Sequence, residues 1–435
     1  MIKKIGLLLL VISLLSCAKH TKKVSFVRMN NSQFTVDGQP YYFVGTNYWY
    51  GSILASEGQG GDRDRLLKEL DLMQQSGIDN LRILVGAEGP NNEPYRVTPA
   101  LQLSPAIYND TILDGLDYLL DEMGKRNMVA VLYLNNTWEW SGGYAQYLNW
   151  NGYGDIPYPE IAPHSWPEFM NYASQFHACE PCREQFKDFI RFILSRTNRY
   201  NQKRYIEDPV IMTWEIANEP RALTNENKKR FAQWIGETAA FIKSIDPNHL
   251  VTTGTEGQHG CEEDMELFKT IHSFPDIDYL TMHIWPKNWG WLDPDHVVET
   301  IDSCIVLAKS YMNDHMIIAQ ELNKPIVFEE FGLPRDHHHY TPDDSTVARD
   351  KYYGSAFRMV EENAKEGGVL AGSNFWAFAG YGRPAGDDNP YWSNGDDLMG
   401  DPPQEQQGLN SVYDTDSTMK LIKEHADRLK KILNK

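Results

Sequence analysis

Eight short apolar runs alternate with amphipathic segments along most of this chain, and this alternation limits the folds it can adopt. Each run has the length of a buried strand, and the segments between the runs have helical spacing. The predicted strands are residues 41–48, 80–86, 128–135, 210–217, 250–255, 279–285, 325–331 and 369–378. The predicted helices are residues 62–76, 111–126, 183–199, 226–245, 296–321, 346–366 and 417–433, with a short one near 262–271. Buried strands joined by helical crossovers predict an α/β fold, a (β/α)8 TIM barrel.

A short hairpin is expected before the barrel, and two long loops within it. Residues 26–28 and 34–36 are strand-like, and the Asp-Gly pair at 37–38 is a turn signal. The loops at 136–180 and 379–410 are rich in aromatic residues. Loops of that length are usually functional. We find no internal repeat or interdomain linker, so residues 25–435 are expected to form a single domain.

The first residues have the pattern of an export signal. Lys3 and Lys4 precede an apolar run, residues 5–15, that is too short to span a bilayer as a mature helix. The run ends in Leu-Leu-Ser-Cys at Cys17, which resembles a bacterial lipobox. That resemblance implies a lipoprotein signal peptide over 1–16, a lipid on the Cys17 thiol and a polar tether over 17–24. An ordinary signal peptide with an incidental cysteine is the alternative.

Export bears on location and on cysteine chemistry. We expect an exported lipoprotein anchored in a membrane, in the periplasm or at the cell surface of a Gram-negative bacterium, with its anchor in the outer membrane. Outside the cytoplasm, Cys179, Cys182, Cys261 and Cys304 can be oxidised. Of the three pairings, 179–182 with 261–304 is the simplest. One Cys-x-x-Cys without a matching second pair is weak evidence for a metal.

Composition argues against some classes of partner. The formal net charge is −19, which repels phosphate backbones, so we expect no nucleic-acid partner. The chain has 12 Trp and 23 Tyr, and aromatic faces are surfaces on which sugar rings stack, although at least half should be core residues. The histidine run at 337–339 is interpreted as a loop, because three consecutive side chains cannot easily converge on one metal ion.

Two predicted strands end in glutamates. Residues 214–220 read Trp-Glu-Ile-Ala-Asn-Glu-Pro, and residues 327–332 read Val-Phe-Glu-Glu-Phe-Gly. In a barrel such strand ends form the face that holds the active site. Two carboxylates that meet there can flank a glycosidic bond, one as proton donor and one as nucleophile. For Asn218 and Glu219 to reach one substrate, the strand must end or bulge, which Pro220 favours. The residues alone do not choose between Glu329 and Glu330.

The two motifs, in this order, resemble the retaining glycoside hydrolases of clan A, family 5. The resemblance implies that Glu219, in Asn-Glu-Pro, is the general acid/base. It implies that Glu330, which precedes Phe-Gly, is the nucleophile rather than Glu329. It therefore also implies that residues 25–435 form a catalytic domain that needs no cofactor and no metal.

The resemblance extends to four substrate-site residues, namely Arg82, Asn218, His283 and Trp376. It implies that Arg82 keeps the nucleophile ionised, which agrees with the effect of a fixed guanidinium on a neighbouring acid. It implies that Asn218 donates to the sugar 2-hydroxyl and that His283 lies near the catalytic pair. Trp376 would form the floor of the subsite for the cleaved sugar; simple core packing is the alternative.

Within family 5 the chain is most similar to the β-mannanases. Residues 134–143, Leu-Asn-Asn-Thr-Trp-Glu-Trp-Ser-Gly-Gly, resemble their third-strand loop, which adds Asn135 and Trp138 to the expected substrate site. One departure is Trp285, where many mannanases have a Tyr that hydrogen-bonds the nucleophile; an indole can only donate. The departure leaves the local hydrogen-bond pattern open.

The expected activity is that of a monomeric, retaining endo-β-1,4-mannanase. It would cleave internal bonds of mannan, glucomannan or galactomannan by double displacement, with the carboxyl groups about 5–5.5 Å apart. Repulsion from the nucleophile should raise the pKa of the acid. The alternatives are another family 5 activity, either a β-1,4-glucanase or an exo-acting β-mannosidase or mannobiohydrolase, and a non-catalytic glycan-binding lipoprotein. A block at one end of the cleft, built by either long loop, would favour exo action.

Overall fold

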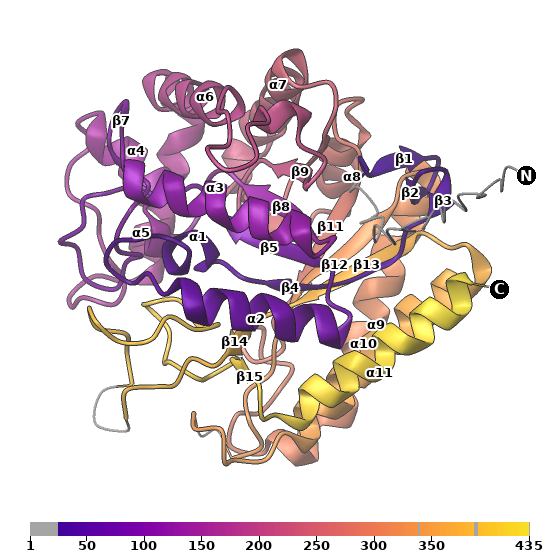
Figure 1. Ribbon diagram of the computed structural model, residues 1–435. Helices are drawn as coiled ribbons and strands as arrows, with labels where there is room; N and C mark the ends of the chain where they lie inside the picture. Colours follow the sequence, from indigo (N-terminus) through magenta and orange to yellow (C-terminus); the bar gives the residue numbers. More distant parts are fainter. Residues whose placement is uncertain (1–24, 338–339, 387–389, 435) are drawn as a thin grey trace, which may run out of the picture.

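The computed structural model describes residues 25–337, 340–386 and 390–434, and its centre is a parallel barrel (Figure 1). The barrel strands are β4 (Phe43–Asn47), β5 (Asn80–Leu84), β8 (Val129–Tyr133), β9 (Ile211–Glu215), β10 (Leu250–Thr252), β11 (Leu280–Ile284), β12 (Ile326–Phe331) and β13 (Leu370–Phe375). They pair in the order β10-β9-β8-β5-β4-β13-β12-β11. A parallel bridge between Thr252 and Tyr279 joins the two ends of that order. The predicted eight-stranded α/β barrel is therefore confirmed.

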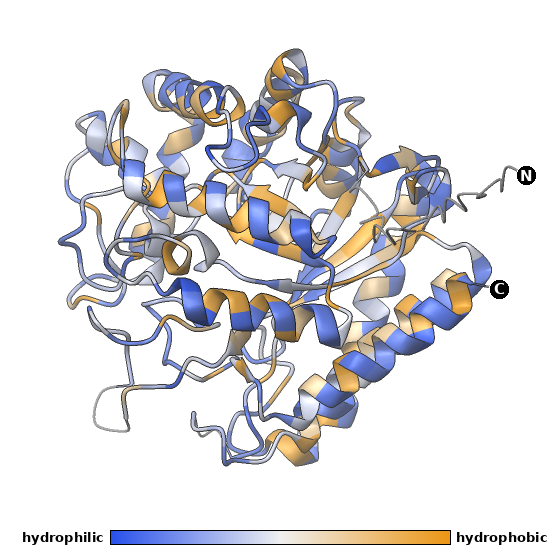
Figure 2. Ribbon diagram, viewed as in Figure 1, coloured by the Kyte–Doolittle hydropathy of each residue, from blue (hydrophilic) through white to orange (hydrophobic). Residues whose placement is uncertain are grey.

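Each strand is fully buried, because one face lines the barrel interior and the other packs under helices. The surrounding helices are α2 (Arg63–Ser76), α3 (Asp110–Lys125), α6 (Glu180–Leu194), α7 (Lys228–Ile245), α8 (Met265–Ser273), α9 (Val297–Leu322), α10 (Val347–Glu366) and α11 (Ser417–Leu433). Hydrophilic and hydrophobic stretches alternate along α2 and α11, as amphipathic helices require (Figure 2). The predicted helix at 183–199 is shifted: α6 begins earlier because Cys179 caps it and Pro181 lies in its first turn, and it ends five residues earlier.

The N-terminal segment closes the end of the barrel at which the strands begin. It forms an antiparallel sheet of β1 (Arg28–Asn30), β2 (Gln33–Val36) and β3 (Gln39–Pro40), so the expected hairpin is present with one more strand. Phe34 of this sheet is fully buried and packs against Phe43 and Tyr279. In Figure 1 this sheet lies at the opposite end of the barrel from β14 (Phe378–Gly380) and β15 (Val412–Tyr413).

The two long loops contain short elements of their own. The loop after β8 holds η1 (Glu139–Ser141), α4 (Gly143–Trp150), α5 (Trp166–Ala173) and η2 (Ser174–Ala178), and the loop after β13 holds β14 and β15. The remaining elements are α1 (Gly51–Leu54), β6 (Gln102–Ser104), β7 (Ile107–Tyr108), η3 (Tyr205–Glu207), η4 (Asn225–Asn227) and η5 (His259–Cys261). Both long loops follow barrel strands and therefore rise at the face where parallel strands end.

One of the two predicted disulfides is wrong. Cys179 and Cys182 are bonded, but Cys261 and Cys304 are buried free thiols. Cys261 lies in η5, where its thiol hydrogen-bonds Thr255, whereas Cys304 lies on α9 beside Tyr352 of α10. The two thiols face different neighbours, which the spacing along the chain does not reveal.

The predicted signal peptide, the tether and the lipidated Cys17 lie outside the described residues, as do two members of the 337–339 histidine run. Among the residues that the structure describes, none of the helices combines the length and apolar character needed to cross a membrane.

Candidate active site

A pocket of about 430 Å³ opens where the barrel strands end. Six indoles line it, from Trp138, Trp140, Trp166, Trp285, Trp289 and Trp376. Five carboxyl side chains line it as well, from Glu160, Glu219, Glu256, Glu330 and Glu405. Both long loops contribute to this wall, so the expectation that they serve the site agrees with their position. Indole faces between carboxylates are a surface suited to neutral polyhydroxylated ligands.

Glu219 reaches the pocket because β9 has already ended. The strand stops at Glu215, and Glu219 adopts a left-handed backbone with φ of 46°, which is uncommon for a residue other than glycine. The amide of Asn218 donates to Asn135 and that of Glu219 donates to Gly254, which fixes this turn between the neighbouring strands. Both side chains therefore line one pocket, as the sequence required.

Three N–H groups converge on the carboxylate of Glu219. His283 Nδ1 lies 2.9 Å from Oε1, and the indoles of Trp138 and Trp285 donate over 2.5 and 3.1 Å. Burial alone would raise the pKa of Glu219, but His283 and the other donors outweigh burial and lower it to about 2. The predicted rise in this pKa is therefore wrong for the protein without substrate, because donors supplied by tertiary structure stabilise the anion.

Trp285, the departure from the mannanase pattern, lies in the pocket beside Glu219. Its indole donates to Glu219 and packs edge-on against Trp376, with 5.8 Å between ring centroids. A Tyr at this place was expected to serve the other acid, Glu330. In this protein the side chain at position 285 therefore hydrogen-bonds Glu219 and not Glu330.

Glu330 is held from below by Arg82, with which it forms an ion pair through Nη1. Arg82 is fully buried, and its Nη1 also donates to Asn47 over 2.9 Å. Its Nε and Nη2 bind the two oxygens of Glu215 over 2.9 and 2.5 Å. Burial raises the pKa of Glu215 to about 8, against the lowering effect of Arg82. Glu215 is thus bound to Arg82 beneath the pocket and does not line it, whereas Glu219 and Glu330 do.

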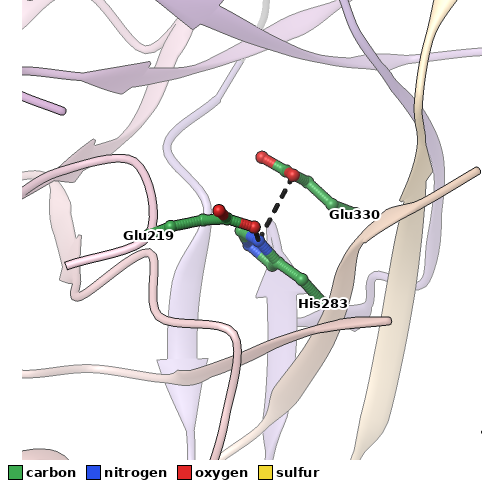
Figure 3. Close-up of side chains that lie close together, drawn as sticks. All are labelled: Glu219, His283 and Glu330. Carbon is green, nitrogen blue, oxygen red and sulfur yellow. Dashed lines mark hydrogen bonds and ion pairs between the residues drawn. The ribbon is translucent and has the colours of Figure 1, made fainter. Parts of the chain in front are cut away.

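Figure 3 shows Glu219 and Glu330 approaching His283 from two sides. One carboxylate oxygen of each and a ring nitrogen of His283 all lie within 4.8 Å of one another. Such a group could hold a metal ion, but both nitrogens of His283 face carboxylates, and these raise its pKa well above the ordinary value in spite of burial. A doubly protonated imidazole has no lone pair for a metal. We therefore regard the three residues as a proton-sharing group.

The other expected residues divide into two kinds. Asn218 and Trp376 line the pocket, and Asn218 Oδ1 accepts from Arg82 Nη2 over 2.8 Å. Asn135 is fully buried, its side-chain oxygen accepts from the amide of Asn136, and it does not line the pocket. Its backbone carbonyl accepts the amide of Asn218, so Asn135 supports the turn that carries Asn218 without lining the pocket.

The sequence did not reveal several acids of the wall. Glu405 comes from the loop after β13; burial raises its pKa to about 8, and the charge of Asp401 adds to the rise. Glu256 follows β10 and pairs with Arg221, whose guanidinium also lies 5.0 Å from the Trp138 ring centre. These residues stand in irregular segments without periodicity, so only loop length and aromatic content pointed to the region.

Comparisons with known proteins agree with this geometry. A family model described as "GH family 5 beta-mannosidase-like" matches residues 24–434. Mannan endo-1,4-beta-mannosidase 5 of Arabidopsis thaliana is 29% identical over 376 residues, which cover 82% of this chain and 80% of that protein. The crystal structure of a glycoside hydrolase family 5 mannosidase from Rhizomucor miehei has a TM-score of 0.86 at 37% identity, with 94% of this chain and 99% of that chain covered. A mutant of the same Rhizomucor protein in complex with mannosyl-fructose gives a TM-score of 0.87 at 37% identity, with the same coverage.

Proposed function

The chain belongs to glycoside hydrolase family 5, and from this premise we propose that it hydrolyses β-mannosides with retention of configuration. The observation that carries the proposal is the pair Glu219 and Glu330, with oxygens within 4.8 Å of each other. Carboxyl groups lie about 5–5.5 Å apart in retaining enzymes and about 6.5–9.5 Å apart in inverting ones, which need room for a water molecule. The short separation supports double displacement.

In the proposed mechanism Glu330 attacks the anomeric carbon while Glu219 gives a proton to the leaving oxygen. The glycosyl ester on Glu330 is then hydrolysed by water that the ionised Glu219 activates, and Glu219 regains its proton. Arg82 forms a direct ion pair with Glu330 and holds its carboxylate in place. Glu330 rather than Glu329 takes the nucleophile's role because Glu330 lines the pocket and Glu329 does not.

We further propose that cleavage occurs at the non-reducing end of short β-1,4-mannooligosaccharides. Pro402, Gln404 and Glu405 close the pocket wall with a segment from the loop after β13. Glu405 is half-buried, but its Oε2 atom is buried and no described residue hydrogen-bonds it. A buried acceptor of this kind needs a donor, and the terminal sugar of a chain offers a hydroxyl that an internal sugar has lost to a linkage. The mannosidase from Rhizomucor miehei, 37% identical to this chain, supports the same choice.

A second candidate is the endo-β-1,4-mannanase activity expected from the sequence. The Arabidopsis relative named mannan endo-1,4-beta-mannosidase favours it, at 29% identity. In this case the bound polysaccharide would extend beyond the pocket at both ends, with more than one sugar on each side of the cleaved bond.

A product profile on mannopentaose, galactomannan and cellopentaose tests the proposal. Exo action predicts mannose as the first product of mannopentaose and a slow fall in galactomannan viscosity. Endo action predicts mannobiose and mannotriose from the start and a fast fall in viscosity. Hydrolysis of cellopentaose without any hydrolysis of mannopentaose would contradict the assignment to mannose.

We also propose that the protein is an exported monomer with a lipid on Cys17. The apolar run at 5–15 and the Leu-Leu-Ser-Cys ending support the export and the lipid. Cells that express the full chain should incorporate labelled palmitate into it, and Cys17→Ala should abolish the label. Equal labelling of both proteins would refute the anchor.

A further inference from the structure

The residue before the proposed nucleophile, Glu329, is a second buried acid for which the proposed mechanism has no role. In the register of β11 against β12, Met282 pairs with Phe328 and His283 pairs with Glu330, so Glu329 has no partner of its own. Neighbouring side chains of a regular strand point to opposite faces, and such a register shift removes that rule. Two successive glutamates can thereby approach the same histidine.

His283 lies between three carboxylates. Its Nδ1 is 2.9 Å from Glu219 Oε1 and 3.3 Å from Glu330 Oε2. Its Nε2 is 3.5 Å from Glu329 Oε2, and neither Nε2 nor either oxygen of Glu329 has a hydrogen bond to a described residue. His283 and Glu329 are both completely buried. Each is therefore the principal partner that the other has on this side.

Few other charges compete for Glu329. Arg82 on β5 approaches it only to 3.8 Å through Nε, while that guanidinium is bound more closely by Glu215 of β9 and by Glu330. Two further titratable groups lie near it. Tyr279, just before β11, has a pKa raised well above the ordinary value, by burial first and then by Glu329, and the pKa of Glu215 is raised by burial and, to a smaller extent, by Glu329. Glu329 is therefore one of the three acids whose side chains raise the pKa of His283.

The acid Glu219 needs a source for its proton. Donors around it lower its pKa to about 2, so the free protein holds Glu219 ionised at neutral pH. Burial would lower the pKa of His283, but the carboxylates around it, that of Glu330 first, raise it well above the ordinary value. The indole N–H of Trp138 is closer to Glu219 but does not ionise, so the nearest acid that can give Glu219 a proton is His283, whose Nδ1 lies 2.9 Å from Oε1.

We propose that Glu329 is a positioning residue that keeps His283 doubly protonated, so that His283 supplies Glu219 with the proton for the leaving group. This inference rests on the proposed function. The N–H bond at Nδ1 breaks, an O–H bond forms at Glu219 Oε1, and His283 is left neutral with its Nε2–H toward Glu329. Glu219 then passes the proton to the glycosidic oxygen. When water attacks the glycosyl ester, Glu219 takes a proton from that water and returns it to Nδ1.

Glu329→Gln tests the proposal because it keeps the shape of the side chain and removes its charge. Without that anion the imidazolium is less stable, so its pKa falls and the proton is lost at lower pH. The alkaline limb of the kcat/KM profile for mannobiose should move down by about one pH unit or more. At pH 8 the loss on mannobiose should reach at least about tenfold. On 2,4-dinitrophenyl β-mannoside, whose leaving group needs no proton, glycosylation should fall less than about threefold. Glu329→Asp, which restores a carboxylate, should recover part of the profile.

The outcomes separate this inference from the proposed function. If wild-type protein hydrolyses both mannosides and Glu329→Gln loses activity equally on both with an unmoved pH profile, the residue is merely structural and the inference is overturned. If wild-type protein hydrolyses neither mannoside, the proposed function fails and the inference fails with it. Should Glu329→Gln not fold, ¹⁵N-histidine-labelled wild-type protein decides. An imidazolium signal that persists to about pH 8 and is missing in His283→Gln supports the inference, and a neutral His283 at pH 7 overturns it.

Discussion

Replacing Glu330 by alanine is expected to lower kcat/KM for mannobiose by at least about 10⁴-fold, because the variant cannot form the glycosyl ester. The fold should survive, since Arg82 keeps its two hydrogen bonds to Glu215. Mannobiose binding, measured by calorimetry, should persist because the indoles of the pocket are untouched. Steady-state hydrolysis of mannobiose, followed by release of mannose, gives the rate.

A matched control for this variant is Glu256→Ala. Glu256 is another buried acid of the same pocket, but it is paired with Arg221 and not with Arg82. It should lose far less activity than Glu330→Ala. With azide and an activated aryl mannoside, Glu330→Ala should yield α-mannosyl azide, since azide enters the space left by the carboxylate. Normal hydrolysis by Glu330→Ala would refute the assignment and make Glu329 the next candidate.

The fold could be predicted well because each barrel element carries its own local signal. Apolar runs such as 128–135 and amphipathic segments such as 417–433 identify strands and helices one at a time. The pairing of cysteines could not be predicted in this way. Cys261 and Cys304 come together or stay apart according to how a loop and a helix pack, and the packing places them against different neighbours.

The site residues on strands could also be predicted, whereas the features that depend on loops could not. Arg82, His283 and Glu330 stand on strands, where an interrupted apolar run marks a functional side chain. The direction of the Glu219 pKa shift could not be predicted, because it depends on how closely His283, and after it Arg221 and the indole of Trp138, approach the carboxylate. Glu405 was missed for a related reason. Its place in the pocket wall depends on the path of an irregular loop, whose sequence has no hydrophobic periodicity from which that path could be predicted.

Glu219 offers the sharpest test of the division of roles between the two acids. Glu219→Ala removes the proton donor of the first step and the base of the second, so kcat/KM for mannobiose should fall by about 10²–10⁴-fold. On 2,4-dinitrophenyl β-mannoside the first step needs no proton and should keep most of its rate. The glycosyl ester on Glu330 should then accumulate, visible as a burst of dinitrophenol and as an added mannosyl mass.

Azide should rescue Glu219→Ala as well, but with the opposite stereochemistry from the nucleophile variant. The anion needs no base and enters from the side that the carboxylate has left, so it attacks the ester on Glu330 and yields β-mannosyl azide. The α product from one variant and the β product from the other require the two carboxylates to act on opposite faces of the same sugar. The geometry of Glu219 and Glu330, with one oxygen of each within 4.8 Å of the other, permits this arrangement. An α product from Glu219→Ala would mean that the two roles are reversed, and Arg82 would then stabilise the acid/base rather than the nucleophile.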